Sequence, residues 1–334
     1  MQVRCLIKLA VIIIAALFSH VNTSGAQTLR VPYVSLTGNQ LPLWIGEKAG
    51  LFKKNRLDAQ LIYMPGGSLI IQALLSGDVG AASLGPPTAM TAWVKGADLV
   101  LIAGGIERLL HVLLASPKIK TPQDLKGKRV GISRFGSLTD IAVREGLRFH
   151  KLRVNQDVAI AQIGGTGERV AALTTGVVDG AVLTVDQMFQ VEKMGYHVLI
   201  DLRKLPFEFP TQGIISRKEF LRDNKDGVKR FLKVYIEGIK ILKTDRDFSI
   251  DLLRKYLKIE DREVLAKTYD AYNEAFESVP YVNRDGVMRA LDSIPEVASK
   301  GSKLNPDSLI DNTIIQELEK EGFLRELYPK SSKR

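Results

Sequence analysis

Two stretches of the sequence share one pattern, and this pattern limits the folds that the chain can adopt. Residues 73–85 and 172–184 each begin with an apolar helical run that ends at a glycine, Gly77 in the first and Gly176 in the second. Glycine suits the left-handed position that closes a helix. A run of small and β-branched residues follows, which is typical of a strand covered on both faces. The repeat predicts two α/β lobes, although Ala-Leu-x-x-Gly is also a common helix ending.

The remaining sequence continues this alternation in two blocks. We predict strands at residues 28–34, 57–63, 79–83, 99–106, 129–133, 158–163, 178–183 and 197–201. Between them we predict helices at residues 41–52, 69–76, 86–95, 137–150, 168–175 and 185–194. This order is typical of a mostly parallel sheet in each lobe.

After residue 217 the patterns indicate helices alone, at 229–242, 250–257, 262–276, 284–294 and 306–321. In the first of these helices, the apolar face consists of Phe231, Leu232, Tyr235, Ile236, Ile239 and Leu242. We assign residues 27–115 and 212–329 to the first lobe and 116–211 to the second, with a disordered tail at 330–334. The chain would then cross twice between the lobes, and paired crossings permit closure around a ligand.

The N-terminus has the composition of a secretory signal peptide. Arg4 and Lys8 precede an apolar run at 9–18, and small residues lead to Ala26. A membrane anchor is the alternative, but the run has about ten residues and a spanning helix needs roughly twenty. We expect cleavage after Ala26, and no later stretch is long and apolar enough to span a bilayer.

Cys5 is the only cysteine of the chain, and it lies within this expected leader. The mature chain would have no disulfide, thiolate metal site or cysteine nucleophile. It would also lack the cysteine of a lipid anchor at the cleavage point, which favours a free periplasmic protein, expected to be a monomer. The net charge of +10 includes Arg4 and Lys8, and the other basic residues are dispersed. We therefore expect no nucleic-acid partner, although the charge could attract anionic ligands.

Loops that follow predicted strands supply the candidate ligand site, because ligands of open α/β sheets bind at the carboxyl ends of the strands. Arg134 and Ser137 follow the first strand of the second lobe, where a guanidinium and a helix start would hold an oxyanion. A solvent-facing arginine is the alternative. In the first lobe, glycines at 66 and 67 would let the backbone approach a ligand, and Ser68 would cap the next helix. The full set of candidates is Ser35, Leu36, Gln40, Trp44, Gly66, Gly67, Ser68, Ser83, Leu84, Gly85, Arg134, Phe135, Gly136, Ser137, Gly165, Thr166 and Asp186.

Several candidates have an alternative role. Trp44 could belong to the core instead of the pocket. Asp186 could bind a ligand amine or cap its helix. Arg108 could contact an anion or pair with its neighbour Glu107, and we favour the pair.

The sequence gives little support for catalysis or for a cofactor. The turn at 165–170 has Val170 where a dinucleotide-binding motif needs its last glycine, and Leu138 departs from a phosphate loop. His111, His150 and His197 are widely separated, so we interpret each as structural. No metalloprotease or serine-hydrolase motif is present. We expect no enzyme activity, no cofactor and no metal.

Three short segments, at 78–83, 125–137 and 178–181, resemble periplasmic substrate-binding proteins of the nitrate, sulfonate and taurine transport group. The resemblance covers residues 28–328, and the same superfamily includes the thiamine-pyrimidine-synthesis proteins. It implies a type II periplasmic-binding fold and delivery of a small, anionic organic ligand to an ABC permease in the inner membrane. The enzymes of the thiamine branch carry a cysteine-rich motif that this mature chain lacks. A pyrimidine-precursor enzyme and a ligand-loaded partner of a membrane sensor kinase remain the alternatives.

Overall fold

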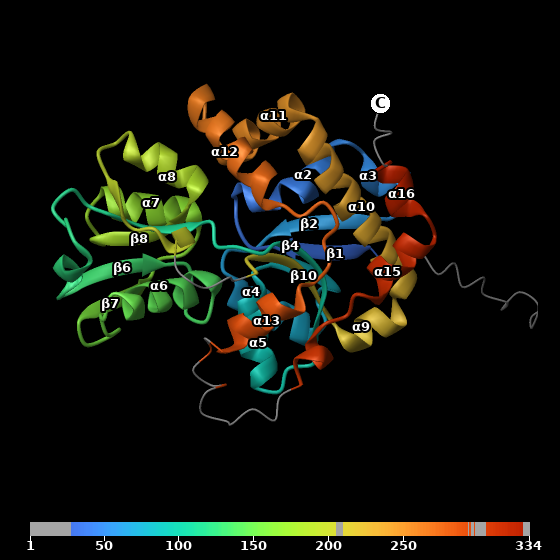
Figure 1. Ribbon diagram of the computed structural model, residues 1–334, viewed down its shortest axis with the longest axis horizontal. Helices are drawn as coiled ribbons and strands as arrows, with labels where there is room; N and C mark the ends of the chain where they lie inside the picture. The colour runs from blue at the N-terminus through green and yellow to red at the C-terminus, as the bar shows by residue number, and fades with distance from the viewer. Residues whose placement is uncertain (1–27, 205–209, 293, 295–296, 298–304, 330–334) are drawn as a thin grey trace, which may run out of the picture.

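Two five-stranded sheets, each covered by helices, form two lobes in the computed structural model (Figure 1). The structure describes residues 28–204, 210–292, 294, 297 and 305–329. The expected signal peptide, the bend at 205–209 and the expected tail at 330–334 lie outside these residues.

The first sheet has the strand order β2-β1-β3-β10-β4. Its strands are β1 (Leu29–Tyr33), β2 (Ala59–Tyr63), β3 (Ala81–Leu84), β4 (Leu99–Ile106) and β10 (Gln212–Arg217). β1 runs parallel to β2 and β3, whereas β10 is antiparallel to both β3 and β4. The chain therefore returns from the second lobe directly into the middle of the first sheet.

The second sheet repeats this arrangement with the order β7-β6-β8-β5-β9. Its strands are β5 (His111–Ala115), β6 (Lys128–Ile132), β7 (Val158–Gln162), β8 (Gly180–Thr184) and β9 (His197–Ile200). The position of β5 corrects our first boundary, which assigned residues up to 115 to the first lobe. β5 is antiparallel to β8 and also pairs with β9. It therefore takes the place in the second sheet that β10 takes in the first. The first crossing thus lies between Ile106 and His111.

The repeated pattern of the sequence falls at equivalent places in the two sheets. Gly77 and Gly176 both have left-handed backbone angles, with φ of 86° and 76°, as the helix endings predicted. The strands that follow, β3 and β8, each have one parallel and one antiparallel neighbour. Both copies therefore lie where the parallel part of a sheet meets its returning strand.

Helices follow the strands in the predicted order. Those of the two lobes are α2 (Leu41–Lys48), α3 (Leu51–Lys54), α4 (Gly67–Ser76), α5 (Pro86–Val94), α6 (Leu138–Phe149), α7 (Thr166–Thr174) and α8 (Val185–Glu192). The later ones are α9 (Lys218–Asp223), α10 (Lys225–Thr244), α11 (Arg246–Leu257), α12 (Arg262–Ala275), α13 (Arg284–Asp292), α15 (Thr313–Lys320) and α16 (Phe323–Leu327). Among the described helices, none is long and apolar enough to cross a membrane.

Three helix predictions were wrong in detail. The single helix expected at 41–52 is two helices, α2 and α3, and Gly50 between them has a left-handed backbone with φ of 70°. The single helix expected at 306–321 is a 3-10 turn at Pro306–Leu309 followed by α15, because Ile310 between them forms a β-bridge with Leu101 at the edge of β4. Ser68 does not cap α4. The helix begins at Gly67, two residues before the predicted start at residue 69, and its N-cap is Gly66.

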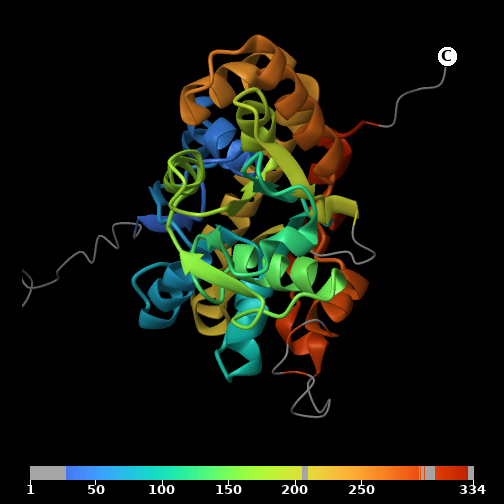
Figure 2. The same ribbon diagram turned by 90° about the vertical axis from the view of Figure 1, so that its left-hand side faces the viewer.

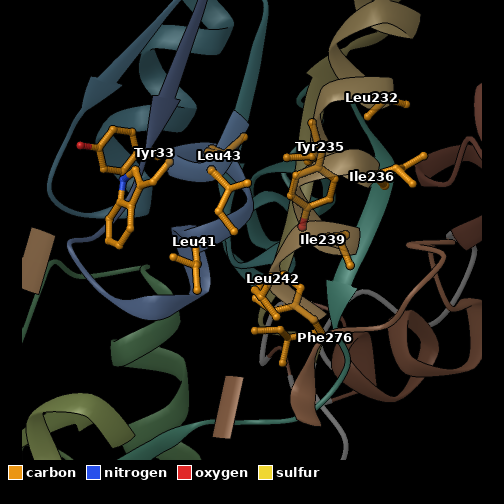
Figure 3. Close-up of a cluster of buried hydrophobic side chains, with 14 of the residues drawn as sticks. Tyr33, Leu41, Leu43, Leu232, Tyr235, Ile236, Ile239, Leu242 and Phe276 are labelled. Carbon is orange, nitrogen blue, oxygen red and sulfur yellow. The ribbon is translucent and has the colours of Figure 1, made fainter. Parts of the chain in front are cut away.

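The core of the first lobe forms where α10 packs on α2 (Figure 3). All six apolar residues predicted for the buried face of α10 are fully buried. The two helices approach closely at Gly238, where an added Cβ would lie 2.2 Å from the carbonyl oxygen of Pro42. A second core cluster includes α4 and α5 on the other side of the sheet and continues into the second lobe through Leu113 of β5.

The two lobes also meet through α8 of the second lobe and α12 of the C-terminal region, which lie side by side in both views (Figures 1 and 2). Val185 of α8 belongs to the same apolar cluster as the first-lobe core. Lys193 forms ion pairs with Asp261 and Glu263 beside this contact. The C-terminal helices therefore hold the second lobe against the first, at one side of the cleft between them.

Candidate functional site

A small cavity lies between the lobes, at the carboxyl ends of strands from both sheets. Its volume is about 50 Å³. Since a single water needs roughly 10–15 Å³ of such space, the cavity has room for a few non-hydrogen atoms. The first lobe contributes Val34, Ser35, Thr37, Asn39, Gly66, Gly67, Gly85 and Thr88. The second contributes His111, Ser133, Ser137, Leu138, Thr139, Gly165, Thr166, Arg169 and Thr184, and Thr211 lies at the return crossing.

Five of these lining residues are the N-caps of helices: Gly66 of α4, Gly85 of α5, Ser137 of α6, Gly165 of α7 and Thr184 of α8. The N-terminus of a helix carries a partial positive charge and N–H groups without partners inside the helix. Helix α5 begins with two prolines, so its first turn offers the dipole but not those two N–H donors. Helices from both lobes thus favour negative charge in the cavity.

Hydroxyl groups make up most of the polar lining. In the second lobe, Ser133, Ser137 and Thr139 form a hydrogen-bonded triangle with oxygen–oxygen distances of 2.8, 2.8 and 2.9 Å. In the first lobe, the hydroxyls of Ser35 and Thr37 lie 2.8 Å apart. A hydroxyl can donate or accept, so these groups can reorient around ligands of different shape.

Arg169 of α7 is the cationic side chain of the lining, and it is 4% exposed. Its Nε donates to the carbonyl of Val182 and its Nη1 to the carbonyl of Gly164, at 3.0 and 2.7 Å. Burial lowers the pKa of Arg169 to about 10, although the charges of Tyr63, Glu168 and Asp186 oppose this shift. Among the described residues, no carboxylate lies within ion-pair distance of the guanidinium. A buried charge without a direct counter-ion is costly, so this position favours an anion.

His111, at the start of β5, is the second titratable side chain of the lining. It is 6% exposed, and its Nδ1 has no hydrogen-bond partner among the described residues. Burial, followed by the charge of Arg169, lowers the pKa of His111 to about 3. The imidazole is therefore neutral at physiological pH.

Asp186 lies behind the cavity wall. Its carboxylate accepts hydrogen bonds from Thr184, which lines the cavity, and from the hydroxyl of Tyr272 on α12 at 3.0 Å. Burial raises the pKa of Asp186, and the hydrogen bonds from Thr184, Tyr272 and Gln187 act in the opposite direction. The N-cap of α8 is Thr184, so Asp186 does not hold the capping position. It joins the lobes at the contact between α8 and α12.

The structure brings seven of the predicted site residues together around the cavity. They are Ser35, Gly66, Gly67, Gly85, Ser137, Gly165 and Thr166. Their contact with a ligand stays a prediction. The other ten do not line it: Leu36, Gln40, Trp44, Ser68, Ser83, Leu84, Arg134, Phe135, Gly136 and Asp186.

Arg134 contacts the opposite lobe instead of facing the cavity. Its Nε donates to the carbonyl of Pro65 at 3.0 Å, and its side chain packs so closely on Gly66 that an added Cβ there would lie 2.5 Å from it. Gly66 also has a φ of +92°, which few other residues adopt. The next two residues do not face the cavity either. The side chain of Phe135 is 51% exposed, and the N–H of Gly136 donates to the carboxylate of Asp140.

Trp44 belongs to the core and not to the pocket, which was the alternative that the sequence left open. Its ring stacks on Tyr256 with centroids 4.2 Å apart, and it is fully buried. Gln40 and Ser83 form a buried hydrogen bond of 2.7 Å beneath the cavity. Leu84 lies in the second core cluster, and Leu36 packs against the first. Arg108 pairs with Glu274 at 2.9 Å, and not with its neighbour Glu107.

Sequence reasoning missed His111 and Arg169 as site residues. Arg169 shares one face of α7 with the buried residues Thr166, Ala172 and Leu173. An arginine on the apolar face of a short helix that follows a glycine-rich turn was the available signal. His111 was interpreted as structural because it precedes an apolar run, and only the crossing of the chain puts it at the cavity.

Among the described residues, no group of three or more His, Cys, Asp or Glu side chains could hold a metal ion. Within the part of the chain that the structure describes, the lining also contains no carboxylate. The arrangement can bind through hydrogen bonds and one fixed positive charge.

Comparisons with known proteins agree with this fold. A candidate binding protein of Brucella abortus is 24% identical over 266 residues, which are 77% of this chain and 80% of that protein. The periplasmic aliphatic sulphonate-binding protein SsuA of Escherichia coli superposes with a TM-score of 0.64 at 21% identity, over 86% of this chain and 99% of SsuA. The periplasmic nitrate-binding protein NrtA of Synechocystis PCC 6803 gives a TM-score of 0.70 at 12% identity, over 91% of each chain.

The periplasmic-binding fold implied by the sequence resemblance is thereby confirmed, with two lobes, two mixed sheets and a helical C-terminal region. A profile of the family described as NMT1/THI5 like matches residues 37–247. Because that match extends over more than half of the chain, the protein belongs to the NMT1/THI5-like family.

Proposed function

We propose that the protein is the periplasmic solute-binding component of an ABC importer and that its lobes close on a small organic anion. The observation that carries this proposal is Arg169, a buried cation that lines the interlobe cavity and has no direct carboxylate partner among the described residues. The N-termini of helices from both lobes add to the attraction. Binding without chemistry agrees with the described lining residues, which include neither a carboxylate nor an activated nucleophile.

The kinship supports the same proposal. SsuA and NrtA are periplasmic proteins that bind a sulphonate and nitrate, and the Brucella relative is named as a candidate binding protein. A ligand enclosed between two lobes favours the closed state by its differential affinity for that state. Delivery would require an inner-membrane permease that recognises the closed protein.

The test begins with native mass spectrometry of protein purified gently from the periplasm of its own host. We expect a stoichiometric small anion that is released unchanged on denaturation. Small-angle scattering then compares the emptied and reloaded protein, and reloading should make the protein more compact.

Substitution of Arg169 tests the observation directly. Because a charged hydrogen bond contributes about 1.5–3 kcal/mol, Arg169→Met should weaken binding about 10- to 100-fold. The control is Arg148→Met, which removes an exposed arginine of α6 in the same lobe and should leave the affinity unchanged. Turnover of the released compound, or equal affinity in both variants, would contradict the proposal.

A further inference from the structure

The cavity has an unusual balance of charge. Among the residues that the structure describes, two titratable side chains line it, Arg169 with a fixed positive charge and His111 with none. One negative charge on a ligand is therefore matched directly by Arg169. A second negative charge meets no further cation among the described lining residues, and an uncompensated buried charge is strongly destabilising.

His111 is placed so that it could supply the missing positive charge. It is more than nine-tenths buried, it lines the cavity, and its Nδ1 has no partner among the described residues. Within the sheet, His111 on β5 pairs with Thr184 on β8, which also lines the cavity. A neutral imidazole has one ring N–H and one lone pair, and uptake of a proton converts the lone pair into a second donor.

The other charged groups near His111 do not take over this role. Arg169 on α7 acts on it and disfavours its protonation. Asp186 on α8 is bound by Thr184 and by Tyr272, and Glu168 on α7 is bound to the backbone N–H of Gly165. On the preceding turn, Arg108 pairs with Glu274. Asp186 is buried and Glu168 is exposed, and because both are carboxylates, neither supplies a positive charge that could match a second ligand charge.

We propose, on the basis of the function proposed above, that His111 sets the charge of the ligand. The site binds a monoanion as it stands and accepts a dianion only when an imidazole nitrogen of His111 takes one proton from the solvent. Affinity for a monoanion is then independent of pH around neutrality. Affinity for a dianion rises as the pH falls, by up to about tenfold per pH unit, because one proton is bound with each ligand.

Methanesulfonate and sulfate are suitable probes, since both are tetrahedral and have five non-hydrogen atoms. The first is a monoanion and the second a dianion over the whole accessible pH range, so neither takes up a proton itself. Binding of each probe, and of the solute released in the mass-spectrometric experiment, is measured by calorimetry in two buffers of different ionisation enthalpy. We expect no proton uptake with methanesulfonate and nearly one proton per site with sulfate, which should also bind more weakly at neutral pH.

A second measurement determines the protonation state of the His111 imidazole directly. In protein with ¹⁵N-labelled histidine, the resonances of His111 should stay those of the neutral ring with methanesulfonate and become those of the imidazolium with sulfate. His111→Gln assigns the signal and should abolish the pH dependence of sulfate binding. His197→Gln, on β9 of the same sheet and outside the lining, should preserve it.

The outcomes separate the two proposals. Sulfate that binds as tightly as methanesulfonate while His111 stays neutral would overturn the role of His111 but leave anion binding intact. The same holds if proton uptake persists in His111→Gln, or if the released solute is a dianion bound without proton uptake. If neither probe nor any released anion binds, the proposed function itself fails, and the inference fails with it.

Discussion

The close approach of α10 to α2 offers a sharp test of the structure, through the substitution Gly238→Ala. The new methyl group would lie 2.2 Å from the carbonyl oxygen of Pro42 and 3.0 Å from its carbonyl carbon. Both are backbone atoms of the neighbouring helix, so no side chain can rotate away. The helices must separate, and separation weakens every contact in the core of the first lobe.

The expected cost follows from two opposing contributions. Overpacking a core costs about 1–3 kcal/mol, and a rigid backbone obstacle puts this case near the upper value. Alanine favours a helix over glycine by about 1 kcal/mol. We therefore expect Gly238→Ala to lower the free energy of unfolding by about 2 kcal/mol, even though the same change stabilises an isolated helix.

The chain contains a matched control in the same helix. A Cβ on Gly227 would meet nothing within 4 Å, so Gly227→Ala should have no overpacking cost and should stabilise by up to about 1 kcal/mol. Urea unfolding can be followed by the fluorescence of Trp44, which is fully buried on α2. Equal midpoints for the two variants, or a more stable Gly238→Ala, would refute the packing of α10 on α2 as described.

Three further predictions concern the site and its surroundings. Gly66→Ala should cost about 1–2 kcal/mol of stability, because φ is +92° at this position, and scattering should show looser closure since Arg134 is displaced. Tyr272→Phe removes a donor to buried Asp186 and should cost about 1–3 kcal/mol. The loss should be larger at pH 7 than at pH 4 in urea titrations, because the unfolded Asp186 ionises near 3.8 while its folded pKa is raised, so stability falls as the pH rises through that window. His111→Gln should make the free energy of unfolding less dependent on pH on the acid side. In the wild type, His111 binds a proton below about pH 6.5 when unfolded but only near pH 3 when folded, which costs up to about 1.4 kcal/mol per pH unit. An unchanged slope between those pH values would contradict the neutral, buried state of His111.

Local pattern was enough to determine most of the elements and their order, but it did not predict β5 and β10, the antiparallel strands at the two crossings. The apolar spacing of α10 identified its buried face, and the glycines at 77 and 176 marked the ends of two helices. Such features depend on neighbours within a few residues, which the sequence displays directly. The family resemblance then indicated the fold, because the same order of elements recurs in proteins that share it.

The site was predictable only in part, for the same reason. Helix starts after strands were correctly expected at one edge of each sheet, and seven of the candidate residues do meet there. Arg134 was predicted to bind an anion because it follows a strand and precedes a helix start, whereas Arg169 was missed. The role of Arg134 depends on Pro65, which lies in the other lobe and is remote in sequence.

Tertiary structure decided which polar groups face the cavity. The position of β5 in the second sheet brings His111 beside Thr184 and turns an apparently structural histidine into part of the lining. The packing of α7 buries Arg169 among backbone carbonyls, and no carboxylate of the described residues lies within ion-pair distance of it. Sequence determined most of the elements because their formation is local, whereas charge and hydrogen-bond balance at the site depends on contacts between lobes, which only the folded chain brings together.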